Sequence, residues 1–101
     1  MILYNVTVNI DDDVREEWIT WMKTKHIPDV LATGQFIDHR FYKLIEEVQN
    51  GGTTYSIQFF ARSMREIDHY LANFATRLRD DHLQKFKDKH VAFRTVLESV
   101  D

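Results

Sequence analysis

His26 stands where an imidazole could move a proton close to neutral pH. It falls in the last turn of a predicted amphipathic helix, directly before Ile27 and Pro28. Beside a ligand pocket, such a side chain could act as a general acid or base, or could orient a carbonyl or a phenol. A histidine at a helix end also bonds the free carbonyls there, and the helix dipole favours its charged form. The structural interpretation therefore weighs more than the catalytic one.

Two tryptophans on the same predicted helix, Trp18 and Trp21, are candidates for the walls of a pocket that would bind an aromatic ligand. Their spacing also places them on the apolar stripe of an amphipathic helix, where large aromatic side chains usually fill the core. Core packing is the stronger interpretation, and ligand binding is the alternative.

A second group of candidate donors lies on strands that are expected later in the chain. Arg40 and Tyr42, with His39 and Arg94, could direct donors towards an anionic or phenolic ligand. Alternation along a strand sends His39 to the opposite face from Arg40 and Tyr42, so these side chains cannot all serve one site. For Arg40 and Arg94, hydrogen bonds across strands or between subunits are the default interpretation.

Several familiar chemistries lack their residues in this sequence. The chain has no cysteine, which excludes a disulfide framework, a thiolate zinc site, an iron-sulfur cluster and a cysteine nucleophile. It has no glycine-rich phosphate loop and none of the common hydrolase motifs. Its five histidines include no pair spaced i, i+4, the spacing that a helix-borne metal site usually needs. We therefore expect neither a metal nor a cofactor.

The balance of charges argues against nucleic acid as a partner. Lysine and arginine number 13 and the acidic residues 16, which gives a net charge of −3 at pH 7. Such a surface would repel a phosphate backbone. The sequence has neither a basic segment followed by an apolar run nor a stretch that could cross a membrane. We expect a cytoplasmic protein that binds no membrane.

The first half of the chain predicts the elements that must position these candidates. Residues 2–10 alternate between an apolar set and a mostly polar set, which predicts a strand. The acidic run at 11–13 suits the start of a helix that should end near His26, because the residue before Pro28 is biased away from helical geometry. Pro28 would then open a short turn that stops at Gly34.

The segment after Gly34 predicts a β-hairpin. Residues 36–48 are rich in aromatic and branched side chains, and the turn signal at 50–52 separates them from a similar run at 53–62.

The last part of the chain predicts a helix and a fourth strand. Ser63 and Glu66 match a capping box, and the apolar spacing that follows predicts a helix as far as Phe86, with a break around 80–81. Residues 91–100 would form the strand.

This order of elements predicts an α+β, ferredoxin-like fold. The arrangement is β-α-β-β-α-β, in which two helices cover one face of a four-stranded antiparallel sheet. The 101 residues fit one domain, 1–101, with enough apolar residues for one core. The open face would carry Leu3, Asn5, Thr7 and Asn9, a mixture that suits pairing with a second copy better than full exposure. We expect a homodimer through this open sheet face.

The segment from Trp18 to Phe36, with its Trp-x-x-Trp and His-x-Pro features, resembles the first-helix region of the dimeric α/β-barrel superfamily. Through its topology, the whole chain is similar to a family of small bacterial proteins of unknown function within that superfamily. The resemblance implies a homodimer whose two sheets close into a barrel with the helices outside. It implies no activity, because the superfamily includes quinone-forming monooxygenases, haem-degrading enzymes, isomerases and proteins with no known chemistry.

Asn5 becomes a candidate catalytic residue through this resemblance. Some oxygenases and haem-degrading members use an asparagine on that strand together with a tryptophan and a histidine. The match is partial, because no tryptophan lies outside the first predicted helix. His69 and His82 lie in the second predicted helix, where an exposed histidine is the stronger interpretation.

Two functions of different classes remain. The favoured one is a structural or interaction module whose dimer face is its main output, which requires a filled core. The alternative is a small-ligand-binding protein or a cofactor-independent oxygenase or isomerase, with a pocket between the first helix and the sheet, near Trp18, Trp21, His26 and Asn5. That alternative predicts a cavity of roughly a few hundred Å³.

Overall fold

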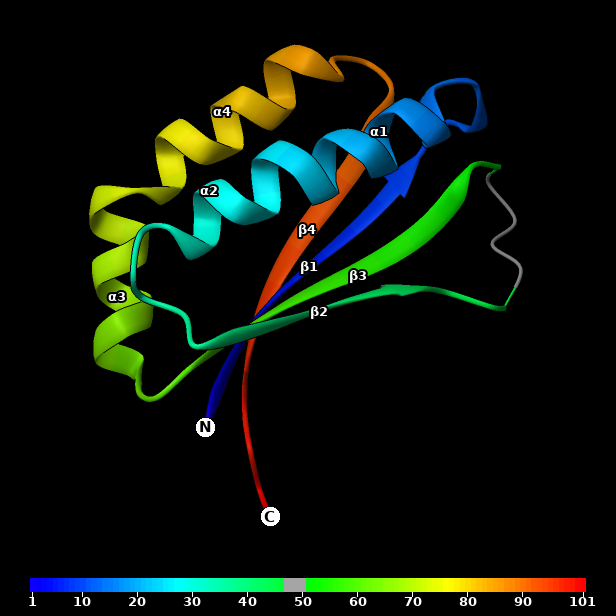
Figure 1. Ribbon diagram of the computed structural model, residues 1–101. Coiled ribbons are helices and arrows are strands. Elements are labelled where there is room, and N and C mark those ends of the chain that lie inside the picture. The colour runs from blue at the N-terminus through cyan, green and yellow to red at the C-terminus, as the bar shows by residue number, and fades with distance from the viewer. Residues whose placement is uncertain (47–50) are drawn as a thin grey trace.

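Four antiparallel strands form one sheet, and the helices lie together on one of its faces (Figure 1). The computed structural model describes residues 1–46 and 51–101. Along the sheet, the strands follow the order β2-β3-β1-β4. The elements in chain order are β1 (Ile2–Ile10), η1 (Asp12–Val14), α1 (Arg15–Trp21), η2 (Met22–His26), α2 (Ile27–Leu31), β2 (Asp38–Lys43), β3 (Thr53–Ala61), α3 (Met64–Asn73), α4 (Ala75–Lys85) and β4 (His90–Glu98). The predicted ferredoxin-like arrangement is confirmed.

The central strand β1 divides its side chains between the two faces as its alternation predicts. Tyr4, Val8 and Ile10 are buried beneath the helices, whereas Leu3 and Asn5 lie on the other face and are only partly covered. Because β1 pairs with β3 on one side and β4 on the other, its alternation sets which residues of those two strands face the helices. The prediction of one covered and one open face is confirmed.

The first helix continues beyond His26, so the predicted end there is wrong. Ile27 keeps helical dihedral angles (φ −61°, ψ −46°), and its N–H bonds the carbonyl of Met22 five residues back. This wider turn, η2, leads into α2, and Pro28 lies near the start of α2. Proline has no N–H to donate to the preceding turn of an ordinary helix, and the wider turn accommodates this missing bond. The bias against helical geometry before proline is thus overcome, and the helix runs to Leu31.

The second helical segment breaks at Phe74 rather than around 80–81. Phe74 leaves helical geometry (φ −126°, ψ −32°) and separates α3 from α4, while Asp80 and Asp81 lie inside α4. At the break, the side chain of Asn73 donates to the carbonyl oxygen of His69 at 3.0 Å. Such a bond competes with the backbone ladder of a helix.

The predicted pairing of the two hairpin strands is confirmed, but the first strand is shorter than predicted. β2 covers Asp38–Lys43 instead of 36–48, and it pairs antiparallel with β3. The predicted turn at 50–52 lies partly outside the described residues. The last strand, predicted for 91–100, is β4 at His90–Glu98.

Gly52 is required by its surroundings, because it has φ of +71° and lies against β1. A Cβ atom at this position would lie 2.7 Å from the backbone oxygen of Ile10 and 2.6 Å from Oδ1 of Asn9. We expect Gly52→Ala to lower the free energy of unfolding by about 3 kcal/mol, through both backbone strain and the clash. Urea unfolding at one fixed protein concentration measures this loss of stability.

The matched control is Gly34→Ala. Gly34 also has a positive φ, +80°, but apart from its own chain neighbours no atom of residues 1–46 and 51–101 lies within 4 Å of the added Cβ. The control should lose only about 1 kcal/mol, the strain of a left-handed residue. Equal losses in the two variants would show that the approach to β1 has no energetic consequence.

Candidate functional site

Three histidines from different parts of the chain meet beneath the helices. His26 ends η2, His82 lies on α4 and His90 begins β4. The ring centroids of His26 and His82 are 5.7 Å apart, and those of His82 and His90 are 4.5 Å apart. His82 reaches this position because it follows Leu78 and precedes Phe86 at intervals of four, on the buried stripe of α4.

His82 is the centre of this cluster and is held in one tautomer. Its side chain is only 5% exposed, and the indole Nε1–H of Trp18 donates to its Nε2 at 2.9 Å. That bond needs a lone pair on Nε2, so the proton of the neutral ring lies on Nδ1. Burial, followed by repulsion from His90, His26 and Arg94, lowers the pKa of His82 to about 3. The ring is uncharged at neutral pH.

His26 packs its ring face against Trp21. The ring centroids are 5.0 Å apart and the planes make an angle of 23°. Burial lowers the pKa of His26 to about 4, although the carboxylates of Asp29 and Asp81 oppose this change; the cations Arg94 and Lys25 add to it. His26 is therefore also neutral at pH 7, and it lies inside a continuous helix rather than at the free carbonyls of a helix end.

A small cavity of about 20 Å³ lies beside the histidines, between the helices and the sheet. Its polar lining comes from two phenols and two guanidinium groups in addition to His26 and His82; these are Tyr4, Tyr70, Arg79 and Arg94. Arg79 donates from Nη2 to the Tyr4 hydroxyl at 2.8 Å. Burial, with a smaller effect of Tyr4, raises the pKa of Tyr70 well above its usual range. This volume is about what one water molecule needs, and far below that of a site for an aromatic substrate.

The two candidate tryptophans belong to the packing around the histidines. Trp18 is fully buried between α1 and the sheet, with its ring centroid 5.0 Å from that of Tyr55 and 5.7 Å from that of Phe41. Trp21 is half-buried and packs on His26 and Phe86. The residues that line the small cavity include neither tryptophan.

Asn5 lies on the opposite face of the sheet from His26. Its Oδ1 accepts from the Ser56 hydroxyl at 2.6 Å, and its Nδ2 donates to Thr7 at 3.1 Å and to Thr95 at 3.2 Å. The two candidate catalytic residues, Asn5 and His26, therefore do not converge within one chain.

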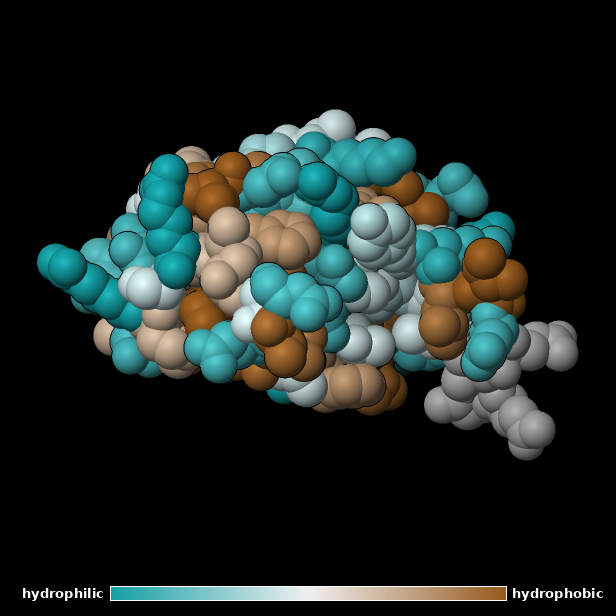
Figure 2. Space-filling view, turned by 90° about the horizontal axis from the view of Figure 1, so that it is seen from below, coloured by the Kyte–Doolittle hydropathy of each residue, from teal (hydrophilic) through white to brown (hydrophobic). Residues whose placement is uncertain are grey.

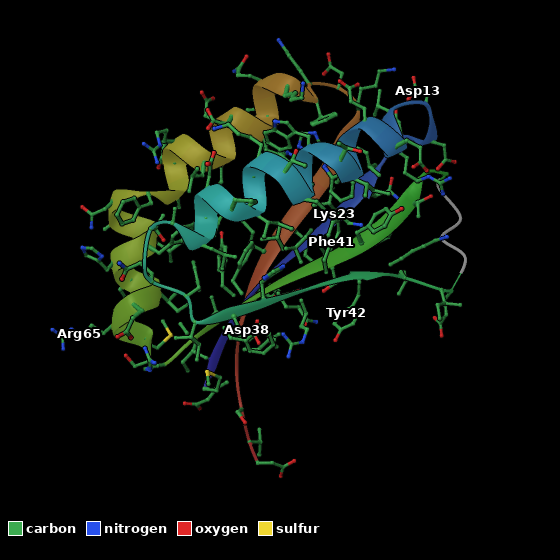
Figure 3. All side chains as sticks on the ribbon, in the orientation of Figure 1. Asp13, Lys23, Asp38, Phe41, Tyr42 and Arg65 are labelled. Carbon is green, nitrogen blue, oxygen red and sulfur yellow. The ribbon has the colours of Figure 1, made fainter. Side chains whose placement is uncertain are left out.

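Arg40 and Tyr42 also lie away from the tryptophans. Consecutive residues of β2 point to opposite sides, so Phe41 faces the helices while Tyr42 points away from them (Figure 3). Arg40 shares the open face with Tyr42, and its guanidinium lies 2.6 Å from a carboxylate oxygen of Asp38. As alternation predicts, His39 lies on the other face from both.

Sequence reasoning missed five residues of the site, which are His82, His90, Arg79, Tyr4 and Tyr70. The interpretation of His82 as an exposed helix histidine is wrong, because the side chain is buried. Its spacing from Leu78 and Phe86 was a usable signal that it lies on the apolar stripe. Arg79 carried no such signal, because its long side chain reaches Tyr4 from a half-buried position on α4.

Within residues 1–46 and 51–101, no group of three or more histidine or acidic side chains is arranged to hold a metal ion. None of the helices in the same residues has the length and the apolar character to span a membrane.

The element order, the strand order and the helices on one face define a ferredoxin-like α+β protein. A family model matches residues 1–100, and the chain belongs to that family, which is described as a domain of unknown function, DUF4286. The sequence resemblance to a small-protein family of unknown function is thus confirmed. No curated protein matches the sequence.

Solved structures with the same fold cover nearly the whole chain. A dimeric ferredoxin-like protein from an uncultured marine organism has a TM-score of 0.74 at 8% identity, covering 99% of this chain and 95% of that one. An ethyl tert-butyl ether d (EthD) family protein from Bacillus halodurans has a TM-score of 0.72 at 8% identity, covering 99% and 100%. SnoaB, a cofactor-independent oxygenase from Streptomyces nogalater, has a TM-score of 0.65 at 8% identity, covering 99% and 93%. At such identities the likeness concerns the fold.

Proposed function

We propose that this protein is a homodimeric interaction domain in which the open sheet face of one copy pairs with the same face of a second copy. The observation that carries the proposal is the state of the polar groups on that face: they already bond to one another. A face of this kind can be covered while leaving few polar atoms unpaired.

The polar centre of the open face is a connected network. Ser56 donates to Asn5, Asn5 donates to Thr7 and Thr95, and Gln58 donates to Ser56 at 3.3 Å. These side chains come from β1, β3 and β4. Since their donors and acceptors are largely paired inside one chain, burial in an interface would lose little hydrogen bonding with water.

Apolar side chains flank this network and remain exposed in the single chain. On β4, Val91 is 70% exposed and Phe93 is 59% exposed, although the register opposite Asn9 and Thr7 puts both on the open face. The view from below shows apolar patches interspersed with hydrophilic side chains (Figure 2). Exposed large apolar groups around a satisfied polar centre are typical of a surface that another protein covers.

A second copy is the occupant that the comparison supports best, because a structure of the same fold and length is described as a dimeric ferredoxin-like protein. The alternative of an oxygenase with an aromatic substrate has less support. The cavity between the helices and the sheet, at about 20 Å³, is too small for such a ligand.

Light scattering on the purified protein tests the proposal. The wild type should have twice the chain mass of 12.1 kDa at micromolar concentration. Phe93→Asp should raise the dissociation constant by about 100-fold, because it places a charge at the centre of the apolar flank. Circular dichroism should show that the variant keeps its fold, because Phe93 does not belong to the hydrophobic core.

Leu83→Asp provides the matched control, because Leu83 is also a large exposed apolar residue but lies on α4, away from the open face. This variant should remain dimeric. A monomeric wild type would exclude the proposal. If Leu83→Asp were monomeric while Phe93→Asp remained dimeric, the interface would lie on the helices and not on the open face.

A further inference from the structure

The outer edge of β4 is able to pair with another strand. β4 lies at one end of the sheet, and among residues 1–46 and 51–101 it pairs only with β1. At one end of this pairing the N–H of Ser99 donates to the carbonyl oxygen of Met1, and at the other end the N–H of Asp11 donates to that of Lys89, each at 2.9 Å. These two bonds continue the β1–β4 register, so the odd-numbered residues of β4 bond to β1. Its even-numbered residues therefore direct their N–H and C=O groups to the outer edge.

The C-terminal half of this edge lies beyond the helices. Val96 is opposite Tyr4, so its side chain is on the helix side of the sheet. Tyr4 is buried, but Val96 is 45% exposed. Figure 1 shows the end of β4, in red, running past the helices. The helices of the described residues therefore leave this half of the edge open to a second strand.

The two charged residues on this half of the edge are arranged around Val96. Arg94 precedes Val96 by two positions and Glu98 follows it by two, so all three side chains are on the same side of the sheet. Neither Arg94 nor Glu98 forms an ion pair with any residue in 1–46 or 51–101. The edge thus presents a positive, an apolar and a negative side chain in that order.

We propose that the outer edge of β4 pairs antiparallel with β4 of another copy of this chain, with the two Val96 residues opposite each other. In this register Arg94 lies opposite Glu98 of the other copy, and the two-fold axis creates the same pair again. Opposite residues have Cβ atoms roughly 5 Å apart, which lets opposite charges stabilise the pairing. The residues that meet are all even-numbered, so the pairing uses the backbone groups that already point to the edge.

Charge complementarity selects the register. A pairing centred on Arg94 instead of Val96 would place two arginines opposite each other, and like charges in that position are destabilising. It would also bring the second strand to the half of β4 that the helices cover, where Ala92 and Arg94 are only partly exposed.

Charge complementarity also favours β4 over β2 as the strand that meets this edge. In the other edge strand, β2, the bond from Leu44 N–H to the Thr54 oxygen continues the β2–β3 register. The odd-numbered residues of β2 therefore point to its outer edge, and none of them is acidic; they are His39, Phe41 and Lys43. Pairing with β2 would leave Arg94 without a carboxylate. Pairing with β4 gives both charges a partner.

Sedimentation velocity from about 1 µM to about 1 mM protein tests the proposal, because this range covers the dissociation constants of weak contacts. The mass of the wild type should rise with concentration above its value at the low end. Val96→Pro should abolish this rise, because proline removes an N–H that points to the edge but keeps the bonds of β4 to β1. Val96→Ala keeps that N–H and is the matched control, which should still associate.

A charge reversal tests the register. Glu98→Arg should weaken the association by about tenfold, since it places two arginines opposite each other. Adding Arg94→Glu reverses both charges of the pair, and the double variant should associate to within about threefold of the wild type. Circular dichroism identifies the folded variants.

The proposal is overturned if the mass of the wild type does not rise, or if folded Val96→Pro associates as strongly as the wild type. It is also overturned if a folded double variant does not recover the association that Glu98→Arg loses, because the edge would then meet a different strand. The proposed open-face dimer is judged separately, by the mass at micromolar concentration and by Phe93→Asp. Arg94, Val96 and Glu98 lie on the other side of the sheet from that face.

Discussion

Replacing Trp18 by alanine is expected to lower the free energy of unfolding by about 3–5 kcal/mol, the range found when a buried aromatic residue is removed. Trp18 is fully buried and packs its ring against Phe41 and Tyr55. The change would also leave Nε2 of His82 without its donor in a buried position. Urea unfolding followed by circular dichroism, at a fixed protein concentration, measures the loss.

Trp18→Phe divides this loss between packing and hydrogen bonding. Phenylalanine keeps most of the ring contacts but cannot donate to His82, so we expect a loss of about 1–3 kcal/mol, the value of an unsatisfied buried polar group. If Trp18→Phe were as stable as the wild type, the bond from Trp18 to His82 would make no net contribution to the fold. If Trp18→Ala lost less than about 1 kcal/mol, the placement of Trp18 in the core would be wrong.

Mild acid is expected to destabilise the folded protein before its carboxylates titrate. The folded pKa of His82 is about 3, and that of His26 about 4, both below the ordinary value of 6.5, with burial as the first cause of each shift. At pH 7 both folded and unfolded states hold these rings neutral. Below pH 6.5 the unfolded chain gains protons that the folded state does not, so stability falls as the pH falls. His82 alone should remove roughly 1 kcal/mol between pH 6 and pH 5, and His26 should add a loss of the same sign.

His82→Gln isolates the contribution of this ring, because glutamine can accept the Trp18 bond but does not titrate. Its free energy of unfolding should vary less steeply between pH 6.5 and 5 than that of the wild type. His69→Gln, an exposed histidine on α3, should keep the wild-type slope. Equal slopes for the wild type and His82→Gln would contradict a neutral, buried His82.

The fold could be predicted from the sequence because its strongest signals are local and repeated. The alternation of β1 fixes which side chains meet the helices, and the apolar spacing after Ser63 places α3. The two errors in the helices have physical causes that a local pattern does not contain. A wide turn accommodates Pro28, and Phe74 leaves the helix although no glycine or proline is near it.

The site was less accessible from the sequence, since it depends on contacts between residues far apart in the chain. Trp18 and His82 are separated by 64 positions, and only the packing of α1 against α4 brings the indole N–H to the imidazole. The faces of the individual strands were predictable. For this reason the separation of His39 from Arg40 was expected, whereas the position of Arg79 and Arg94 beside one cavity was not.

The position of β4 at the end of the sheet has a consequence for the handling of the protein. Among the residues that the structure describes, β4 pairs only with β1, so one edge of this nine-residue strand presents N–H and C=O groups that can template another strand. The same strand carries the exposed Val91 and Phe93. A chain without its partner would thus expose an apolar surface next to an unprotected edge, the combination that promotes aggregation. Pairing of the open faces would act as protection against aggregation, and the most vulnerable species would be the newly folded, still solitary chain.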